Sequence, residues 1–129
     1  MRRYKVNMSG YDIGQWEYQT VEAMARRYNA NRRRADVLSE LQSGVHGEQR
    51  EVMIWEVGLV ERAARETADG EWQRALMLVC CDGWRYEDVE TSLMPTNNRN
   101  AFFRARREFY WRLWGLLQAE LGRMVAGES

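Results

Sequence analysis

The helical spacing of its apolar residues constrains this chain more than any other feature. Apolar side chains recur at three- and four-residue steps along most of the 129 residues, whereas no stretch alternates with a period of two for long enough to form a strand. Pro95 is the only proline. Because a proline ends or breaks a helix, the sequence predicts an all-α fold with an interruption at Met94 and Pro95.

Capping residues and glycines divide the chain into expected helices. We expect residues 1–19, which are aromatic and polar without a clear period, to form a partly ordered arm, and residues 20–129 to form a single helical domain. Thr20 is the expected N-cap of the first helix, which Asn29 to Asn31 can bend. The expected helices cover residues 20–43, 48–68, 71–82, 86–93 and 96–121. A long N-terminal helix, 20–43, is thus expected to pack on a helix-turn-helix region, 48–121, in a bundle of about five helices.

Apolar rows mark the predicted core. The second expected helix carries two such rows and should pack on two sides: Val52, Trp55, Leu59 and Ala63, and Met53, Val57, Val60 and Ala64. The last expected helix has one core row: Phe102, Ala105, Phe109, Leu113 and Leu116. A second row lies beside it: Phe103, Tyr110, Trp114 and Leu117. Since apolar patches of this size are rarely left bare, either the N-terminal helix or a second subunit should cover this second row.

Charge is unevenly distributed along the chain although its formal net charge is zero. Two blocks of arginine stand out: Arg26, Arg27, Arg32, Arg33 and Arg34, and then Arg99, Arg104, Arg106 and Arg107. The intervening segment, residues 48–71, is acidic. The first block can clamp the phosphates of DNA, or it can pair with the acidic segment, and the sequence leaves both interpretations open.

One side of the last expected helix has the composition of a DNA-reading surface. Asn100, Arg104, Arg107 and Trp111 are spaced i, i+4, i+7 and i+11, so they share a side roughly opposite the core row. Asparagine can pair with adenine and arginine with guanine in the major groove. The other expected DNA contacts are Asn97, Asn98 and Arg99 at the same end of the helix, together with Arg85, Arg32 and Arg33. The alternative is that this side is only solvated.

The order of these segments resembles a known family. WQRALMLV at 72–79, GWRYEDV at 83–89 and NNRNAFFRAR at 97–106 look like the C-terminal helix-turn-helix of a sigma factor. Within that group the chain is most similar to the small phage regulators of late transcription of the RinA and ArpU type, over roughly residues 20–117. The resemblance implies sequence-specific binding to a phage or prophage promoter and activation or modulation of the host RNA polymerase.

No catalytic constellation is found in the sequence. His46 is the only histidine and has no triad motif near it. Cys80 and Cys81 are adjacent, which gives no metal-ligand spacing, and we expect them to be reduced and buried. Neither common phosphate-binding glycine motif occurs. An acidic cluster is explained as the solvated start of a short helix: Glu87, Asp88 and Glu90. We therefore expect no enzymatic activity, metal or cofactor.

The expected location is the cytoplasm of a bacterial host cell. No apolar run approaches the roughly 18 residues needed to span a bilayer, and the first residues, MRRYKVNMSG, lack the apolar region of a secretory signal. No membrane partner is therefore expected.

The sequence favours a sequence-specific DNA-binding transcriptional regulator of phage or prophage genes. Its recognition helix, residues 96–111, would lie in the major groove of double-stranded DNA. Two alternatives stay open: a phage DNA-packaging protein similar to a small terminase subunit, and a protein-interaction module that binds RNA polymerase or a host defence protein. RNA polymerase and a second copy of the chain are the further partners considered.

Overall fold

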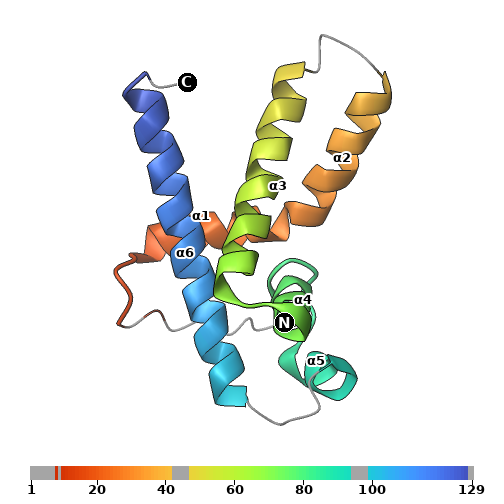
Figure 1. The fold of residues 1–129 in the computed structure, drawn as a ribbon, viewed down its shortest axis with the longest axis vertical. Helices are drawn as coiled ribbons and strands as arrows, with labels where there is room; N and C mark the ends of the chain where they lie inside the picture. The colour runs from red at the N-terminus through yellow and green to blue at the C-terminus, as the bar shows by residue number, and fades with distance from the viewer. Residues whose placement is uncertain (1–7, 9, 42–46, 94–98, 128–129) are drawn as a thin grey trace.

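A computed structural model describes residues 8, 10–41, 47–93 and 99–127 of the chain. These residues form six α-helices and no strand, which confirms the predicted all-α fold (Figure 1). The helices are α1 (Gln15–Arg26), α2 (Tyr28–Leu41), α3 (Gly47–Thr67), α4 (Gly70–Cys80), α5 (Tyr86–Leu93) and α6 (Arg99–Val125). There are six rather than about five because the expected N-terminal helix is divided in two.

Helix α3 occupies the middle of the bundle. It packs against α2 on one side and α6 on the other, while α1 runs across them and contacts α3 and α6 (Figure 1). The short helices α4 and α5 lie at one end, beside the beginning of α6. At the opposite end α3 and α6 diverge, so the shared core lies where α1, α3, α4 and α6 meet, with contributions from the beginning of α2 and from α5.

The core uses the apolar rows that the sequence predicts, but only in part. On α3 the second half of each row is buried, whereas Val52 in the first half is 55% exposed because α6 has diverged from α3 there. On α6 the core row supplies three fully buried side chains: Phe102, Phe109 and Leu113. Two helical turns of α3 therefore contribute little to the core.

The second apolar row of α6 is covered within the same chain. Tyr110 and Leu117 of this row are buried, and the Tyr110 ring meets the Tyr18 ring of α1 edge-on, with centroids 5.2 Å apart at 84°. An edge-to-face pair is the favoured geometry for two aromatic rings. The sequence left two ways to cover this row, the N-terminal helix or a second subunit. In the structure the N-terminal helical segment packs on it.

The beginning of the N-terminal helix was predicted wrongly. Helix α1 begins at Gln15 after Gly14 as N-cap, and Thr20 lies inside it, where its hydroxyl donates to the carbonyl oxygen of Trp16 at 2.9 Å. The extra turn forms because Tyr18 belongs to the buried face of α1, with Val21 and Met24 three and six residues further on. This periodicity was hidden among the polar residues of the expected arm.

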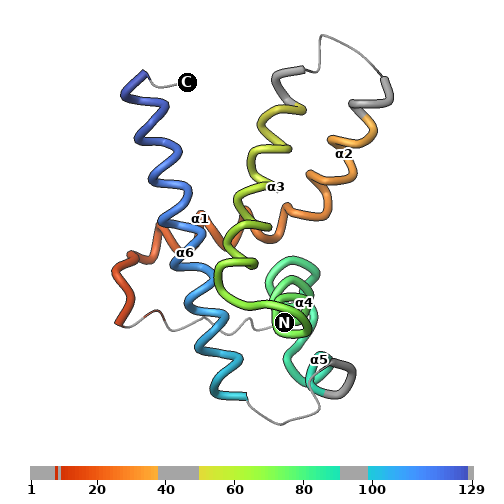
Figure 2. The backbone as a smooth tube through the Cα atoms, in the orientation of Figure 1, coloured from red at the N-terminus to blue at the C-terminus, as the bar shows by residue number. Residues whose placement is uncertain are grey.

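The expected bend at Asn29 to Asn31 is displaced. The backbone changes direction at Arg27, between α1 and α2 (Figure 2). Asn31 lies within α2, where its side chain is buried and its amide donates to Glu56 of α3 at 2.9 Å. The asparagine thus satisfies its amide across two helices instead of competing with the backbone of its own helix. At the other end of the chain, α6 extends to Val125, beyond the expected end at Leu121.

Candidate nucleic-acid interface

Aromatic packing holds α5 against the beginning of α6. The Tyr86 ring at the start of α5 lies 5.2 Å from the Phe102 ring and 5.4 Å from the Phe103 ring of α6, measured between centroids. Phe102 also meets Trp72 of α4 at 6.2 Å. These contacts fix the two helices on either side of the predicted break. The break itself, and with it the candidate residues Asn97 and Asn98, lies outside the described residues.

Arg85 caps the start of α5 together with Asp88. The Asp88 carboxylate accepts a hydrogen bond from the Arg85 backbone N–H at 3.3 Å and pairs with the Arg85 guanidinium at 3.4 Å. This is the return half of a capping box. Hydrogen bonding to Arg85 lowers the pKa of Asp88, and the same contact raises the pKa of Arg85. The Arg85 side chain remains exposed, so it can still reach a phosphate.

The Arg99 side chain contacts residues of both α5 and α6. Its guanidinium pairs with Glu87 at 3.3 Å and its Cζ lies 5.3 Å from the Tyr86 ring centroid and 5.2 Å from that of Phe103. These contacts combine an ion pair with cation–π attraction. Arg99 therefore occupies a position between two helices, and we assign it to holding α6 in place more than to contacting DNA.

Sequence reasoning missed Arg106, whose Cζ lies over the Phe103 ring, 4.7 Å from its centroid. A signal was present, because Arg99, Phe103 and Arg106 are spaced i, i+4 and i+7 and so share one face of a helix. The pairing of Arg99 with Glu87 had no comparable signal, since the two residues belong to different helices, α6 and α5.

The uncommitted polar side of α6 consists of Asn100, Arg104 and Arg107. Asn100 and Arg104 are exposed and Arg107 is half-buried. None of the three makes an ion pair or side-chain hydrogen bond with any residue that the structure describes. Trp111 is the fourth residue predicted for this side. It is 39% exposed, and its ring centroid lies 6.0 Å from that of Tyr11. This side therefore presents two arginines and one amide whose donors are free for an external acceptor.

The first arginine block, residues 26–34, could either pair with the acidic segment or bind phosphates, and its members differ in which of these the structure favours. Arg27 donates two hydrogen bonds to the Glu56 carboxylate of α3, at 3.2 and 3.0 Å, so pairing with the acidic segment is correct for this residue. Arg33 and Arg34 are exposed and make no ion pair within the described part of the chain. Arg32 lines a pocket between α2 and α4. The phosphate-binding interpretation is thus left to Arg32, Arg33 and Arg34.

The two cysteines at the end of α4 are buried free thiols. Burial raises the pKa of Cys80 from its ordinary 9.0 to about 11, against the opposing effect of a hydrogen bond with Tyr110. Burial likewise raises the pKa of Cys81, with the neighbouring Cys80 and Asp82 adding to the effect. Because reactivity belongs to the thiolate, both thiols are held in an unreactive form.

We expect these thiols to make stability depend on alkaline pH. The folded state holds the Cys80 proton more tightly than the unfolded state, so this contribution is complete below pH 9 and is lost as the pH rises toward about 11. Denaturant unfolding at a series of pH values should show the fall, and Cys80→Ala should reduce it. Thiol labelling of the native protein at neutral pH should be limited by unfolding, and rapid labelling without unfolding would contradict this assignment.

No group of three or more His, Cys, Asp and Glu side chains within the described ranges is arranged to hold a metal ion. Across the same ranges, no helix combines the length and the apolar character needed to cross a membrane. Comparison of the chain with protein-family models, curated proteins and solved structures found no match.

Proposed function

We propose that this protein binds double-stranded DNA through Asn100, Arg104 and Arg107 of α6, and that it regulates transcription of phage or prophage genes inside a bacterial cell. The observation that carries the proposal is that these donors are exposed or half-buried and uncommitted, on a long helix whose beginning is fixed by α5. No acidic residue lies between Arg99 and Arg107 to oppose a phosphate backbone.

The dimensions of α6 suit this task. A helix with its side chains is about 10–12 Å wide, and the major groove is about 12 Å wide. α6 has 27 residues, so it is roughly 40 Å long and its first turns can enter a groove while its later turns pack on α1 and α3. The order of a short helix, α5, followed by a long arginine-rich helix, α6, supports the resemblance to sigma-like phage regulators.

Each candidate residue has a separate part in the proposal. Asn100, Arg104 and Arg107 would contact base edges and nearby phosphates. Arg85, exposed just before α5, and Arg33, exposed on α2, would add phosphate contacts without sequence preference. Arg99 would keep the beginning of α6 at its place beside α5. A net charge of zero does not oppose this arrangement, because the local distribution of charge decides where DNA can bind.

The test is the salt dependence of DNA binding by an Arg104→Ala/Arg107→Ala variant. We expect its affinity for a duplex selected from random sequences to fall at least about tenfold, and the slope of log affinity against log salt to decrease by roughly one for each phosphate that the variant no longer neutralises. Arg62→Ala/Arg123→Ala is the matched control, since it removes the same charge from two arginines already paired with carboxylates. Equal behaviour of the two variants would remove the α6 side from the DNA interface.

A second candidate is a protein-interaction module, favoured by apolar side chains at the end of the molecule where α3 and α6 diverge. The exposed residues are Val37, Val52, Ile54, Leu121, Met124 and Val125. Exposed apolar surface of this kind is typical of protein-binding sites. Absence of DNA binding at low salt, together with a stable complex with RNA polymerase, would favour this function over DNA reading.

A further inference from the structure

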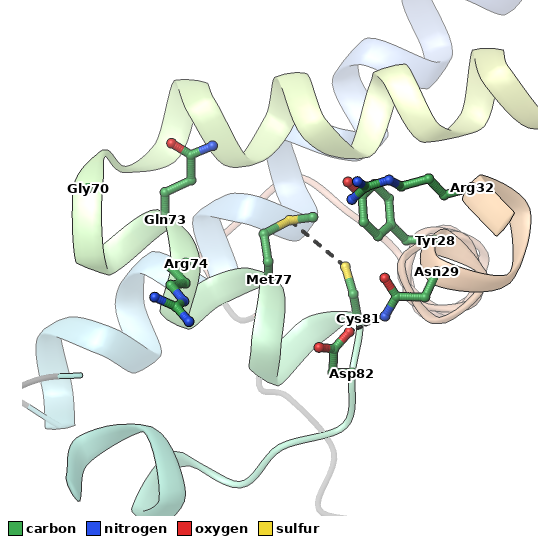
Figure 3. Close-up of a pocket in the computed structure, with 9 residues that line it drawn as sticks. All are labelled: Tyr28, Asn29, Arg32, Gly70, Gln73, Arg74, Met77, Cys81 and Asp82. Carbon is green, nitrogen blue, oxygen red and sulfur yellow. Dashed lines mark hydrogen bonds between the residues drawn. The ribbon is translucent and has the colours of Figure 1, made fainter. Parts of the chain in front are cut away.

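A pocket of about 350 Å³ lies between α2 and α4, away from the proposed reading side of α6 (Figure 3). Arg32 and Asn29 on α2 form one wall, and Gln73 and Arg74 on α4 form the other. Met77 supplies apolar surface between them. The pocket is large enough for more than a simple ion, since sites for small organic ligands begin at about 300 Å³.

The Asp82 carboxylate and the Tyr28 hydroxyl of this pocket already have hydrogen-bond partners. The Asp82 carboxylate accepts a hydrogen bond from the Asn29 amide. The Tyr28 hydroxyl donates to Glu61 at 2.7 Å, and burial together with this bond raises the pKa of Tyr28 to about 12, so the hydroxyl stays neutral. The Tyr28 hydroxyl therefore adds no negative charge, and the Asp82 carboxylate stands against two arginines among the residues that line the pocket.

The polar groups that face this pocket are mainly hydrogen-bond donors, and one of them, Arg32, is already hydrogen-bonded to the Tyr28 hydroxyl. Arg32 and Arg74 make no ion pair with any carboxylate in the part of the chain that the structure describes, unlike Arg27, which is paired with Glu56. Gln73 extends from α4 toward α3 and adds an amide N–H donor to the lining of the pocket. Two permanent cations with planar donor forks favour an anion with several oxygens, and phosphate fits this geometry.

We propose that the pocket binds a phosphate ester, with Arg32 and Arg74 donating to the phosphate oxygens, Gln73 donating an amide hydrogen and Met77 contacting the attached sugar or base. The phosphate can belong to the backbone of a nucleic acid or to a free nucleotide. Because no residue of the α6 reading side takes part, this inference goes beyond the proposed function and does not depend on it.

The experiment follows the side-chain N–H signals of Gln73, Arg32 and Arg74 in the nitrogen-15 NMR spectrum of the full chain. It uses three probes: deoxyadenosine 5′-monophosphate, deoxyadenosine without phosphate, and a short DNA duplex. We expect the nucleotide to shift these signals saturably and the nucleoside to leave them unchanged. Arg74→Gln should weaken nucleotide binding about tenfold or more, because it removes charge-assisted hydrogen bonds.

The control is Arg65→Gln, which removes the same charge from an exposed arginine of α3 that does not line the pocket. Arg74 is exposed and has no ion-pair partner among the described residues, so Arg74→Gln should keep the melting temperature of the parent. Arg32→Gln provides a second variant on the opposite wall. Equal affinities of the parent and both pocket variants would overturn the assignment of these arginines.

The arms of the experiment distinguish the two sources of phosphate. Shifts with the nucleotide and the duplex support a general phosphate-ester site, shifts with the nucleotide alone support a free-nucleotide site, and shifts with the duplex alone support a backbone contact. No saturable shift with either phosphate probe would overturn the proposal. Arg104→Ala/Arg107→Ala should leave the nucleotide-induced shifts unchanged, so failure of the pocket and failure of the α6 reading side give different results.

Discussion

Phe102→Ala is expected to lower the free energy of unfolding by about 3–5 kcal/mol, the usual range for removing a buried phenylalanine. Phe102 is fully buried where α4, α5 and α6 meet. Its ring contacts Trp72, Tyr86 and Phe103, so truncation removes the packing against three aromatic rings and opens a cavity in one step. Most small domains have only about 5–15 kcal/mol of stability in total, so a large fraction of the variant should unfold on mild heating.

The measurement is urea unfolding monitored by tryptophan fluorescence and, separately, by circular dichroism. Trp16→Ala is the control, because Trp16 is 80% exposed and its removal should change stability by less than about 0.5 kcal/mol. Truncation of Phe102 should also release α5 from α6, so DNA binding should disappear at temperatures where the parent still binds. A decrease in stability no larger than that of the control would show that the aromatic junction does not hold these helices together.

Helical periodicity predicts much of this fold because it depends on neighbours three and four residues away. Helix α5 has the predicted bounds, and α3 and α4 each begin one residue before theirs. The uncommitted side of α6 was predicted for the same reason, since Asn100, Arg104 and Arg107 share a side whenever the segment is helical.

Contacts between distant segments could not be predicted in this way. Arg27 pairs with Glu56 across 29 positions and Arg99 with Glu87 across 12, and no local spacing rule selects either partner. The pocket has the same origin, because Arg32 and Arg74 belong to helices that only tertiary packing places together. The sequence therefore shows where the arginines are, but only the packing of the helices shows which of them are paired with carboxylates.

Glu56→Ala should lower the free energy of unfolding by about 2 kcal/mol, the second largest effect that we expect on stability. The Glu56 side chain is 17% exposed and accepts hydrogen bonds from Arg27 and from the buried Asn31. Its removal leaves the Asn31 amide without its acceptor in a buried position, which costs about 1–3 kcal/mol. Arg27 is half exposed, so water can replace its partner and the ion pair adds at most about 1 kcal/mol.

Glu66→Ala is the matched control, because Glu66 accepts from Arg62 on the same helix in an exposed i, i+4 pair. Such pairs contribute about 0.3–0.5 kcal/mol. A double-mutant cycle of Glu56→Ala with Asn31→Ala should give a larger coupling energy than one with Arg27→Ala, since the buried amide is the group that depends most on this acceptor. The reverse order would mean that the ion pair stabilises the junction of α1, α2 and α3. In that case high salt should weaken the parent protein markedly, whereas a buried amide contact predicts little dependence on salt.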